Sequence, residues 1–191
     1  MKLKNEMYMY HGSYAPIETI DLSLCLEGKD FGKGFYLTSD FEQARSFVKN
    51  SIKKAKNMNM ISDEVNHGYV TTFQYVEQKE SCTTFTFDDT NKEWLWYVAM
   101  NRRTQLSEIL KDDISSRLLN AEIVIGKIAN DRTNPTITAY LNGLYGDIKS
   151  DESIQFTIKQ LMPNKLKDQY CFKSEKAISC LDFVEVTEYE G

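Results

Sequence analysis

The fold is decided by Tyr10-His11-Gly12-Ser13 and, further on, by Asp30-Phe31-Gly32-Lys33-Gly34-Phe35-Tyr36-Leu37-Thr38. The first stretch follows an apolar run, which predicts a strand over 7–10 with His11 at its end. The second stretch passes two glycines and enters a predicted strand over 35–37. The two stretches should therefore bring a histidine and a tyrosine to the edges of two strands.

A helix is predicted to follow, from Ser39 to about Lys56. Ser39 and Glu42 have the spacing of a capping box, in which the serine oxygen accepts a hydrogen bond from the third helical N–H. Apolar residues recur at the three-to-four-residue spacing of one helix face, at Phe41, Ala44, Val48 and Ile52. A polar loop over 57–66 comes next.

The rest of the chain alternates between strand and helix patterns. Strands are predicted over 69–76, 83–87, 122–126, 169–173 and 182–187, and 83–87 could pair with 69–76. Helices are predicted over 91–101, 106–119 and 151–161, with a brief turn over 174–180 and a further helix after the polar loop 130–135. This mixture predicts an α+β fold with a mostly antiparallel sheet, in a single domain over 1–191.

Composition narrows the classes of function. With 191 residues, 41% hydrophobic and 27% charged, the chain should form one well-buried soluble domain. The net charge of −5 argues against a broad nucleic-acid-binding face, because neutralising phosphates needs clustered lysine and arginine. The small basic run at Lys49–Lys56 is interpreted as the solvated side of a helix.

Cysteine spacing and hydropathy limit cofactors and compartment. The four cysteines have no C-x-x-C spacing and lie far from both histidines, so neither a zinc site nor a disulfide framework is expected. The sequence contains no apolar run long enough for a signal peptide or a membrane span. A cytoplasmic protein without a membrane partner is expected.

The residue types in the two quoted stretches are suited to binding NAD, which carries a flat carboxamide-bearing ring attached to a ribose. Their order resembles the ADP-ribosyltransferases of the diphtheria-toxin and poly(ADP-ribose) polymerase type, with H-G-S, then G-x-G-[IF]-Y, then a helix, and a glutamate at the start of a late strand. The order is also similar to that of a bacterial family of uncharacterised transferase-like proteins, commonly toxin-like or encoded beside a small partner. The resemblance covers about 9–183.

The resemblance implies split antiparallel β-sheets with flanking helices, and NAD as a substrate. It implies that the Gly12 backbone binds the carboxamide and that His11 binds a ribose hydroxyl, with support from Ser13. Tyr36, which follows the bend at Gly34, should stack on the nicotinamide ring.

The resemblance also places Gln169, in Asp168-Gln169-Tyr170-Cys171-Phe172, where the glutamate would be. Glutamine forms hydrogen bonds but carries no charge, so transfer of one ADP-ribose unit, or slow chemistry, is expected rather than chain elongation. Phe47 either covers the second face of the nicotinamide or packs in the core.

The leading hypothesis is an NAD-dependent mono-ADP-ribosyltransferase of toxin type, with His11, Tyr36 and Gln169 as the catalytic set. An unidentified macromolecular or small-molecule acceptor and a small cognate antitoxin protein would be its partners. The alternatives are a non-catalytic NAD-binding or partner-binding module and an enzyme that modifies nucleic acid. His11 could also be a structural strand-end histidine, and the glycines could serve a tight turn. The narrower family pattern further includes Asn101, Arg102, Asn130 and Asp131, to which no role is assigned.

Overall fold

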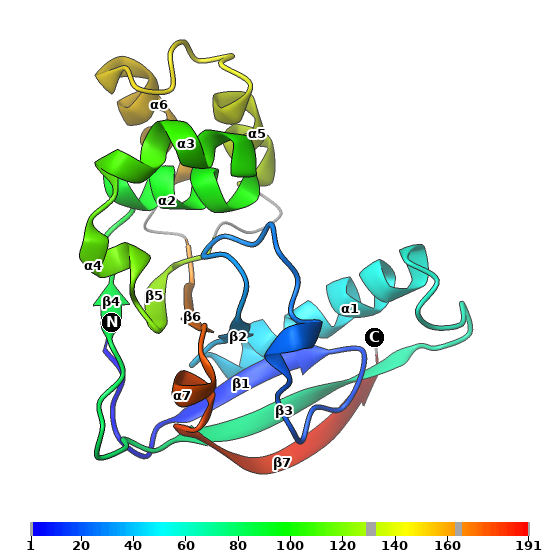
Figure 1. Ribbon diagram of the computed structural model, residues 1–191. Helices are drawn as coiled ribbons and strands as arrows, with labels where there is room; N and C mark the ends of the chain where they lie inside the picture. The colour runs from blue at the N-terminus through cyan, green and yellow to red at the C-terminus, as the bar shows by residue number, and fades with distance from the viewer. Residues whose placement is uncertain (1, 129–132, 163–165, 191) are drawn as a thin grey trace.

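The structure, a computed structural model, describes residues 2–128, 133–162 and 166–190. Within these ranges the strands form two sheets, with the orders β1-β3-β7 and β2-β6-β5-β4 (Figure 1). The strands are β1 (Tyr8–Ser13), β2 (Phe35–Leu37), β3 (His67–Tyr75), β4 (Thr84–Thr86), β5 (Ile123–Lys127), β6 (Asp168–Phe172) and β7 (Leu181–Glu190). Neighbouring strands in these sheets run antiparallel except β4 and β5, so the predicted α+β class with a mostly antiparallel sheet is confirmed.

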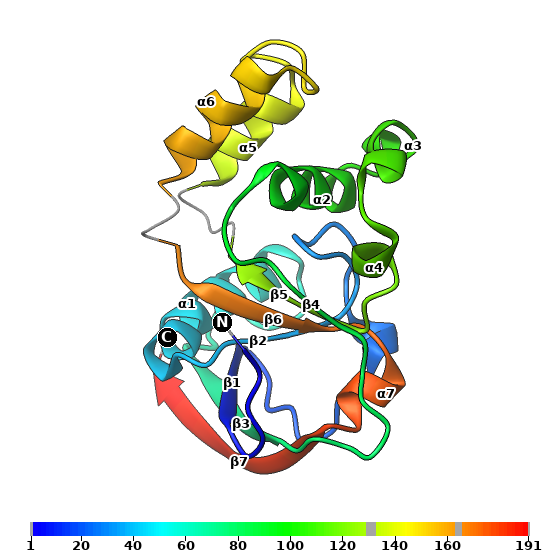
Figure 2. The same cartoon turned by 90° about the vertical axis from the view of Figure 1, so that its left-hand side faces the viewer.

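The helices over 41–57 and 92–102 lie on the outer sides of the two sheets, whereas the short helix over 175–178 contributes Ala177 to the core between them (Figure 1, Figure 2). The helices are α1 (Phe41–Asn57), α2 (Lys92–Arg102), α3 (Ser107–Leu110), α4 (Ser116–Leu119), α5 (Asn134–Leu141), α6 (Asp151–Leu161) and α7 (Glu175–Ile178). Short 3₁₀ turns occupy Leu22–Leu24, Thr104–Leu106 and Lys111–Asp113. None of the helices in the described ranges is both long enough and apolar enough to cross a membrane.

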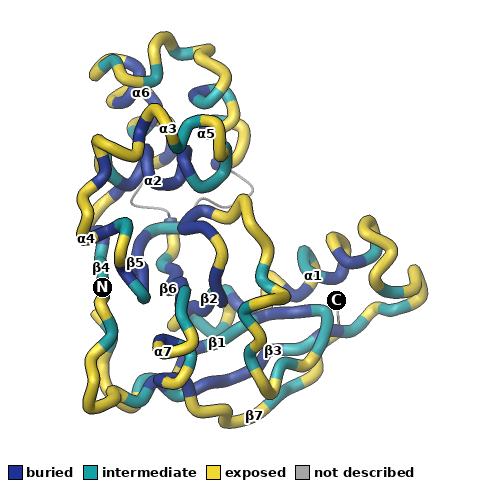
Figure 3. The backbone as a smooth tube through the Cα atoms, viewed as in Figure 1, coloured by how far each residue is buried: buried dark blue, intermediate teal, exposed yellow. Residues whose placement is uncertain are grey.

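Three clusters of buried side chains define the layers. Met9 and Phe73 from the first sheet meet Tyr170 and Phe172 from the second, so the two sheets pack face to face. The opposite face of the first sheet packs on α1 through Ala44, Val48, Ile52 and Val70. The opposite face of the second sheet packs on α2, which Figure 3 colours largely as buried. The order of layers is thus α1, first sheet, second sheet, α2.

Helix α2 is enclosed, which explains why its strongly apolar sequence is not amphipathic. Each residue from Trp94 to Met100 is buried, which is the pattern of a helix covered on all sides. The Trp94 indole Nε1 donates to the Lys127 carbonyl at 3.1 Å, so the buried indole has a hydrogen-bond partner. The helix predicted over 91–101 is confirmed, and its two indoles lie in the core.

Two predicted boundaries were wrong. Strand β1 runs on to Ser13, so His11 lies inside the strand rather than at its end. Asp40 rather than Ser39 caps α1, because the Asp40 Oδ1 accepts from the Gln43 N–H at 3.0 Å. Aspartate and serine are equally good capping residues, so the sequence spacing alone could not choose between neighbours.

One predicted strand pairing was also wrong. Strand β4 pairs in parallel with β5 and not with β3. The physical reason lies in its side chains, because Phe85 and Phe87 pack with the buried residues of α2 in the second sheet's outer core. The expected helix over 106–119 is present only as α3, α4 and the short turns between them.

Candidate functional site

The two sheets are joined where β1 meets the residue after β2. The Tyr10 N–H donates to the Thr38 carbonyl at 2.8 Å, and the Thr38 N–H donates back to the Tyr10 carbonyl at 3.0 Å. Backbone groups of successive strand residues point in alternating directions. The N–H and C=O of Gly12, two residues on, therefore point the same way as those of Tyr10, toward β2 and away from β3.

Gly12 is also fixed by packing. A Cβ at this position would lie 2.0 Å from the Ala44 carbonyl oxygen of α1, far inside contact distance. Because both partners are backbone, a side chain here would require α1 and β1 to separate. The packing against α1 therefore explains why residue 12 is glycine. The direction of its backbone N–H and C=O groups is independent of this packing.

His11 connects β1 to β2 through its side chain. Its Nδ1 lies 2.8 Å from the Tyr36 carbonyl oxygen, and its ring stacks on Phe35 with centroids 4.5 Å apart. A carbonyl oxygen only accepts, so Nδ1 carries the proton and Nε2 is left with an acceptor lone pair. Burial lowers the pKa of His11 from 6.5, which favours this neutral form near neutral pH.

The His11 imidazole should therefore titrate with a midpoint below pH 6.5 in the folded chain. The fold favours the neutral ring, so its contribution to stability is present above pH 6.5 and is lost as the pH falls below that value. The measurement is an NMR titration of the His67→Ala variant, which retains a single imidazole. A midpoint at or above 6.5 would contradict a neutral His11 imidazole that is shielded from solvent.

Tyr36 closes the glycine-rich bend. Its hydroxyl donates to the Gly32 carbonyl at 2.7 Å and accepts from the Phe31 N–H at 3.0 Å. Burial raises the pKa of this phenol well above its usual value, so it stays neutral. Gly32 has φ +85°, a left-handed conformation that suits glycine, and a Cβ on Gly34 would lie 2.6 Å from the Cys171 Sγ. The half-buried Tyr36 ring is thus fixed by two hydrogen bonds of its hydroxyl, to the Gly32 carbonyl and from the Phe31 N–H.

Two other predicted residues have clear local roles. The Ser13 Oγ accepts from the Ala15 N–H at 3.3 Å, which stabilises the turn after β1. Phe47 is 39% exposed, and the Lys54 ammonium lies 5.3 Å from its ring centroid. The core alternative for Phe47 is therefore wrong, while its role as a second ring wall stays a prediction.

Gln169 is buried in β6 beside a charge pair. Its Nε2 donates to the Asp30 Oδ2 at 3.1 Å, and Asp30 is paired with Arg102 at 2.8 Å. The paired strands β2 and β6 place Cys171 opposite Tyr36, and Gln169 follows the same face two residues earlier. Gln169 and Tyr36 are thus brought to one face of the second sheet, next to the Asp30–Arg102 pair.

Sequence reasoning missed the role of Asp30, although this residue begins the motif that contains Tyr36. It also left Asn101 and Arg102 without roles. The Asn101 side chain donates to the Tyr97 carbonyl at 2.8 Å and would contact any side chain at Gly32. The Asn130 and Asp131 positions lie outside the described residues.

The first turn of α1 lies against the start of β6. Gln43 Nε2 donates to the Asp168 carbonyl at 3.3 Å, and Lys167 pairs with the cap residue Asp40 at 2.5 Å. The Gln43 Oε1 is buried without a donor among the described residues. Polar groups of α1 therefore reach the backbone directly before Gln169.

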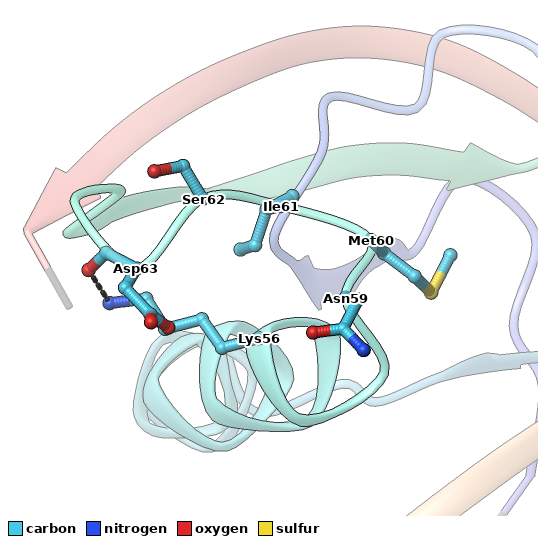
Figure 4. A pocket seen from close by; sticks show the side chains of 6 residues that line it. All are labelled: Lys56, Asn59, Met60, Ile61, Ser62 and Asp63. Atoms are coloured by element: carbon cyan, nitrogen blue, oxygen red, sulfur yellow. Dashed lines mark hydrogen bonds between the residues drawn. The ribbon is translucent and has the colours of Figure 1, made fainter.

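Two hollows on the surface lie away from these residues. One follows the end of α1, where the Lys56 ammonium donates to the Asp63 carbonyl at 2.6 Å across a loop (Figure 4). Its lining residues are Lys56, Asn59, Met60, Ile61, Ser62 and Asp63. A second hollow beside α2 includes Trp96 and Asp113. Neither hollow contains His11, Tyr36 or Gln169, so the candidate site rests on backbone direction and side-chain contacts.

Comparison with known proteins gives one family. A family model described as "Protein of unknown function (DUF3990)" matches residues 7–183. No curated protein matches the chain.

Proposed function

The chain belongs to the DUF3990 family of unknown function, and from its own residues we propose that it is an NAD-dependent mono-ADP-ribosyltransferase with an ADP-ribosyltransferase-like split-sheet fold. It would cleave the bond between nicotinamide and ribose and transfer one ADP-ribose unit to an acceptor. The observation that carries the proposal is the direction of the Gly12 backbone N–H and C=O groups. Both point toward β2, next to the contact between His11 and Tyr36.

A strand edge is complementary to a carboxamide. The nicotinamide amide offers one carbonyl acceptor and N–H donors, and Gly12 offers one N–H and one C=O in the same direction. Two parallel hydrogen bonds would fix both the position and the rotation of the ring. The strand pairing at Tyr10 and Thr38 supports this assignment, because it turns these groups away from β3.

His11 and Tyr36 would hold the rest of the nicotinamide riboside. The neutral His11 ring has Nε2 free of a described donor, so a ribose hydroxyl could donate to it. The Tyr36 ring would stack on the nicotinamide, worth about 1 kcal/mol beyond the area it buries. Both side chains are anchored before any ligand binds, which lowers the entropy cost of binding.

The chemistry requires stabilisation of a cationic transition state. When nicotinamide leaves, positive charge develops on the ribose, and a polar acceptor nearby lowers the barrier. Gln169 supplies an amide dipole without a full charge. Transfer of a single unit, or slow turnover, fits this site better than chain elongation.

The test is release of nicotinamide from NAD⁺ by the purified protein, with and without cell extract. Changing His11→Ala should lower the rate about ten-fold or more, because one hydrogen bond and one stacked ring are lost. His67→Ala is the matched control, since His67 and Gly68 repeat the same dipeptide at the start of β3. Labelled NAD⁺ separates protein from nucleic-acid acceptors. The proposal fails if the protein neither binds NAD⁺ nor releases nicotinamide.

A non-catalytic NAD-binding module is the second candidate. The neutral Gln169 and the pairing of Asp30 with Arg102 favour it, because both leave little net charge beside the ribose. NAD⁺ binding that persists in Gln169→Ala, is lost in His11→Ala and gives no nicotinamide would select this alternative.

A further inference from the structure

Three distant segments meet in one buried polar cluster. Asp30 comes from the loop before β2, Arg102 from the last turn of α2 and Gln169 from β6. The side chains of Arg102 and Asp30 are 16% and 9% exposed, and Gln169 is 6% exposed. Buried charges of this kind require partners, so the geometry of the cluster is closely constrained.

The two carboxylate oxygens of Asp30 have different partners. Oδ1 accepts from Arg102 Nε at 2.9 Å and lies 2.8 Å from Arg102 Nη2. Oδ2 accepts from Gln169 Nε2 at 3.1 Å. Arg102 Nη1 in turn donates to the Asn134 Oδ1 of α5 at 2.8 Å. The arginine thus fixes Asp30, and Asp30 has one oxygen directed to Gln169.

This division determines which way the Gln169 amide faces. A carboxylate only accepts, so the amide must present Nε2 to Asp30. The other amide atom, Oε1, then remains as the acceptor, and no described residue donates a hydrogen bond to it. With a neutral partner at position 30, either end of the amide could face that partner.

We infer that Asp30 is a positioning residue, which fixes the Gln169 amide so that Oε1 accepts a ribose hydroxyl of NAD⁺. This inference rests on the proposed function. It also explains why glutamine can occupy the position of a glutamate. A glutamate at 169 would lie against the Asp30 carboxylate, and the repulsion between like charges would be large. In this protein Asp30 carries the negative charge, and the Gln169 Oε1 is the oriented hydrogen-bond acceptor.

Variants that exchange the carboxylate at position 30 and the amide at position 169 test the inference. In Asp30→Asn, the oxygen of the introduced amide would serve Arg102 and its nitrogen would face Gln169, which would turn Oε1 inward and Nε2 toward the ligand. The kcat for nicotinamide release should fall about ten-fold with little change in KM, because the lost acceptor acts on the developing charge. The double variant with Gln169→Glu regains an acceptor and should recover most of this loss. A double variant no better than the single one would overturn the inference.

An NMR measurement gives a readout that does not depend on activity. In ¹⁵N-labelled wild type, one Gln169 side-chain amide proton should be shifted downfield and exchange slowly, and Asp30→Asn should abolish both properties. If the amide responds in this way but no nicotinamide is released, the proposed function fails and the orientation by Asp30 stands. If the amide does not respond, the inference fails whatever the activity.

Gln169→Glu alone covers the case in which Asp30→Asn does not fold, since it keeps the pair between Asp30 and Arg102. Two adjacent carboxylates should depress nicotinamide release at neutral pH, and activity should recover at lower pH as they share a proton. Higher activity than wild type at neutral pH would contradict a positioning role for Asp30.

Discussion

Gly12→Ala should prevent α1 from docking on β1 and destabilise the fold by about 3 kcal/mol or more, at the upper end of overpacking costs. The added Cβ would lie 2.0 Å from the Ala44 carbonyl oxygen and 2.9 Å from its carbon. Neither atom belongs to a flexible side chain, so the strain cannot be relieved by a change of rotamer. Chemical denaturation followed by circular dichroism measures the loss, and NAD⁺ binding should be lost with it.

Gly28→Ala provides the matched control for this substitution. Gly28 has φ +75°, and a Cβ there would meet nothing within 4 Å. Its cost should come from backbone strain alone, about 1 kcal/mol. If Gly12→Ala were no worse than Gly28→Ala, the close packing of α1 on β1 would be contradicted, and the role of Gly12 would reduce to its backbone groups.

Local patterns in the sequence were sufficient for most elements of the fold. The apolar spacing in 41–52 predicted α1, and a helix was correctly predicted over 91–101, which corresponds to α2. These features follow from side chains a few positions apart, which a single sequence displays directly. The sequence also placed His11 and Tyr36 on two separate strands, and the structure links these strands through the bond between His11 Nδ1 and the Tyr36 carbonyl.

Non-local features could not be predicted in the same way. The partner of β4 depends on where Phe85 and Phe87 are buried, and both join the core around α2. Asp30 and Gln169 are far apart in the chain, and nothing in their local sequence indicates that they share a hydrogen bond. The tautomer of His11 likewise depends on a tertiary contact. The sequence predicted which residues would belong to the candidate site, whereas their orientation required the fold.

Arg102→Ala should be the most destabilising of the charge-removing substitutions, at about 3–5 kcal/mol. It removes the guanidinium that pairs with the buried Asp30 carboxylate, while the bond from the Gln169 amide remains. A hydrogen bond from a neutral amide does not replace the lost countercharge. Denaturant unfolding at neutral pH measures the loss.

Arg45→Ala is the comparison that separates burial from charge. Arg45 pairs with Glu42 at 3.8 Å on the exposed side of α1, with side chains 54% and 68% exposed. Removing it also loses the contact of its guanidinium with Tyr189, 5.3 Å from the ring centroid, so the stability should change by no more than about 1 kcal/mol. Similar losses for the two variants would mean that Asp30 is solvated in the folded chain. A solvated Asp30 would have water rather than Arg102 as its main partner, and its hold on the Gln169 amide would weaken accordingly.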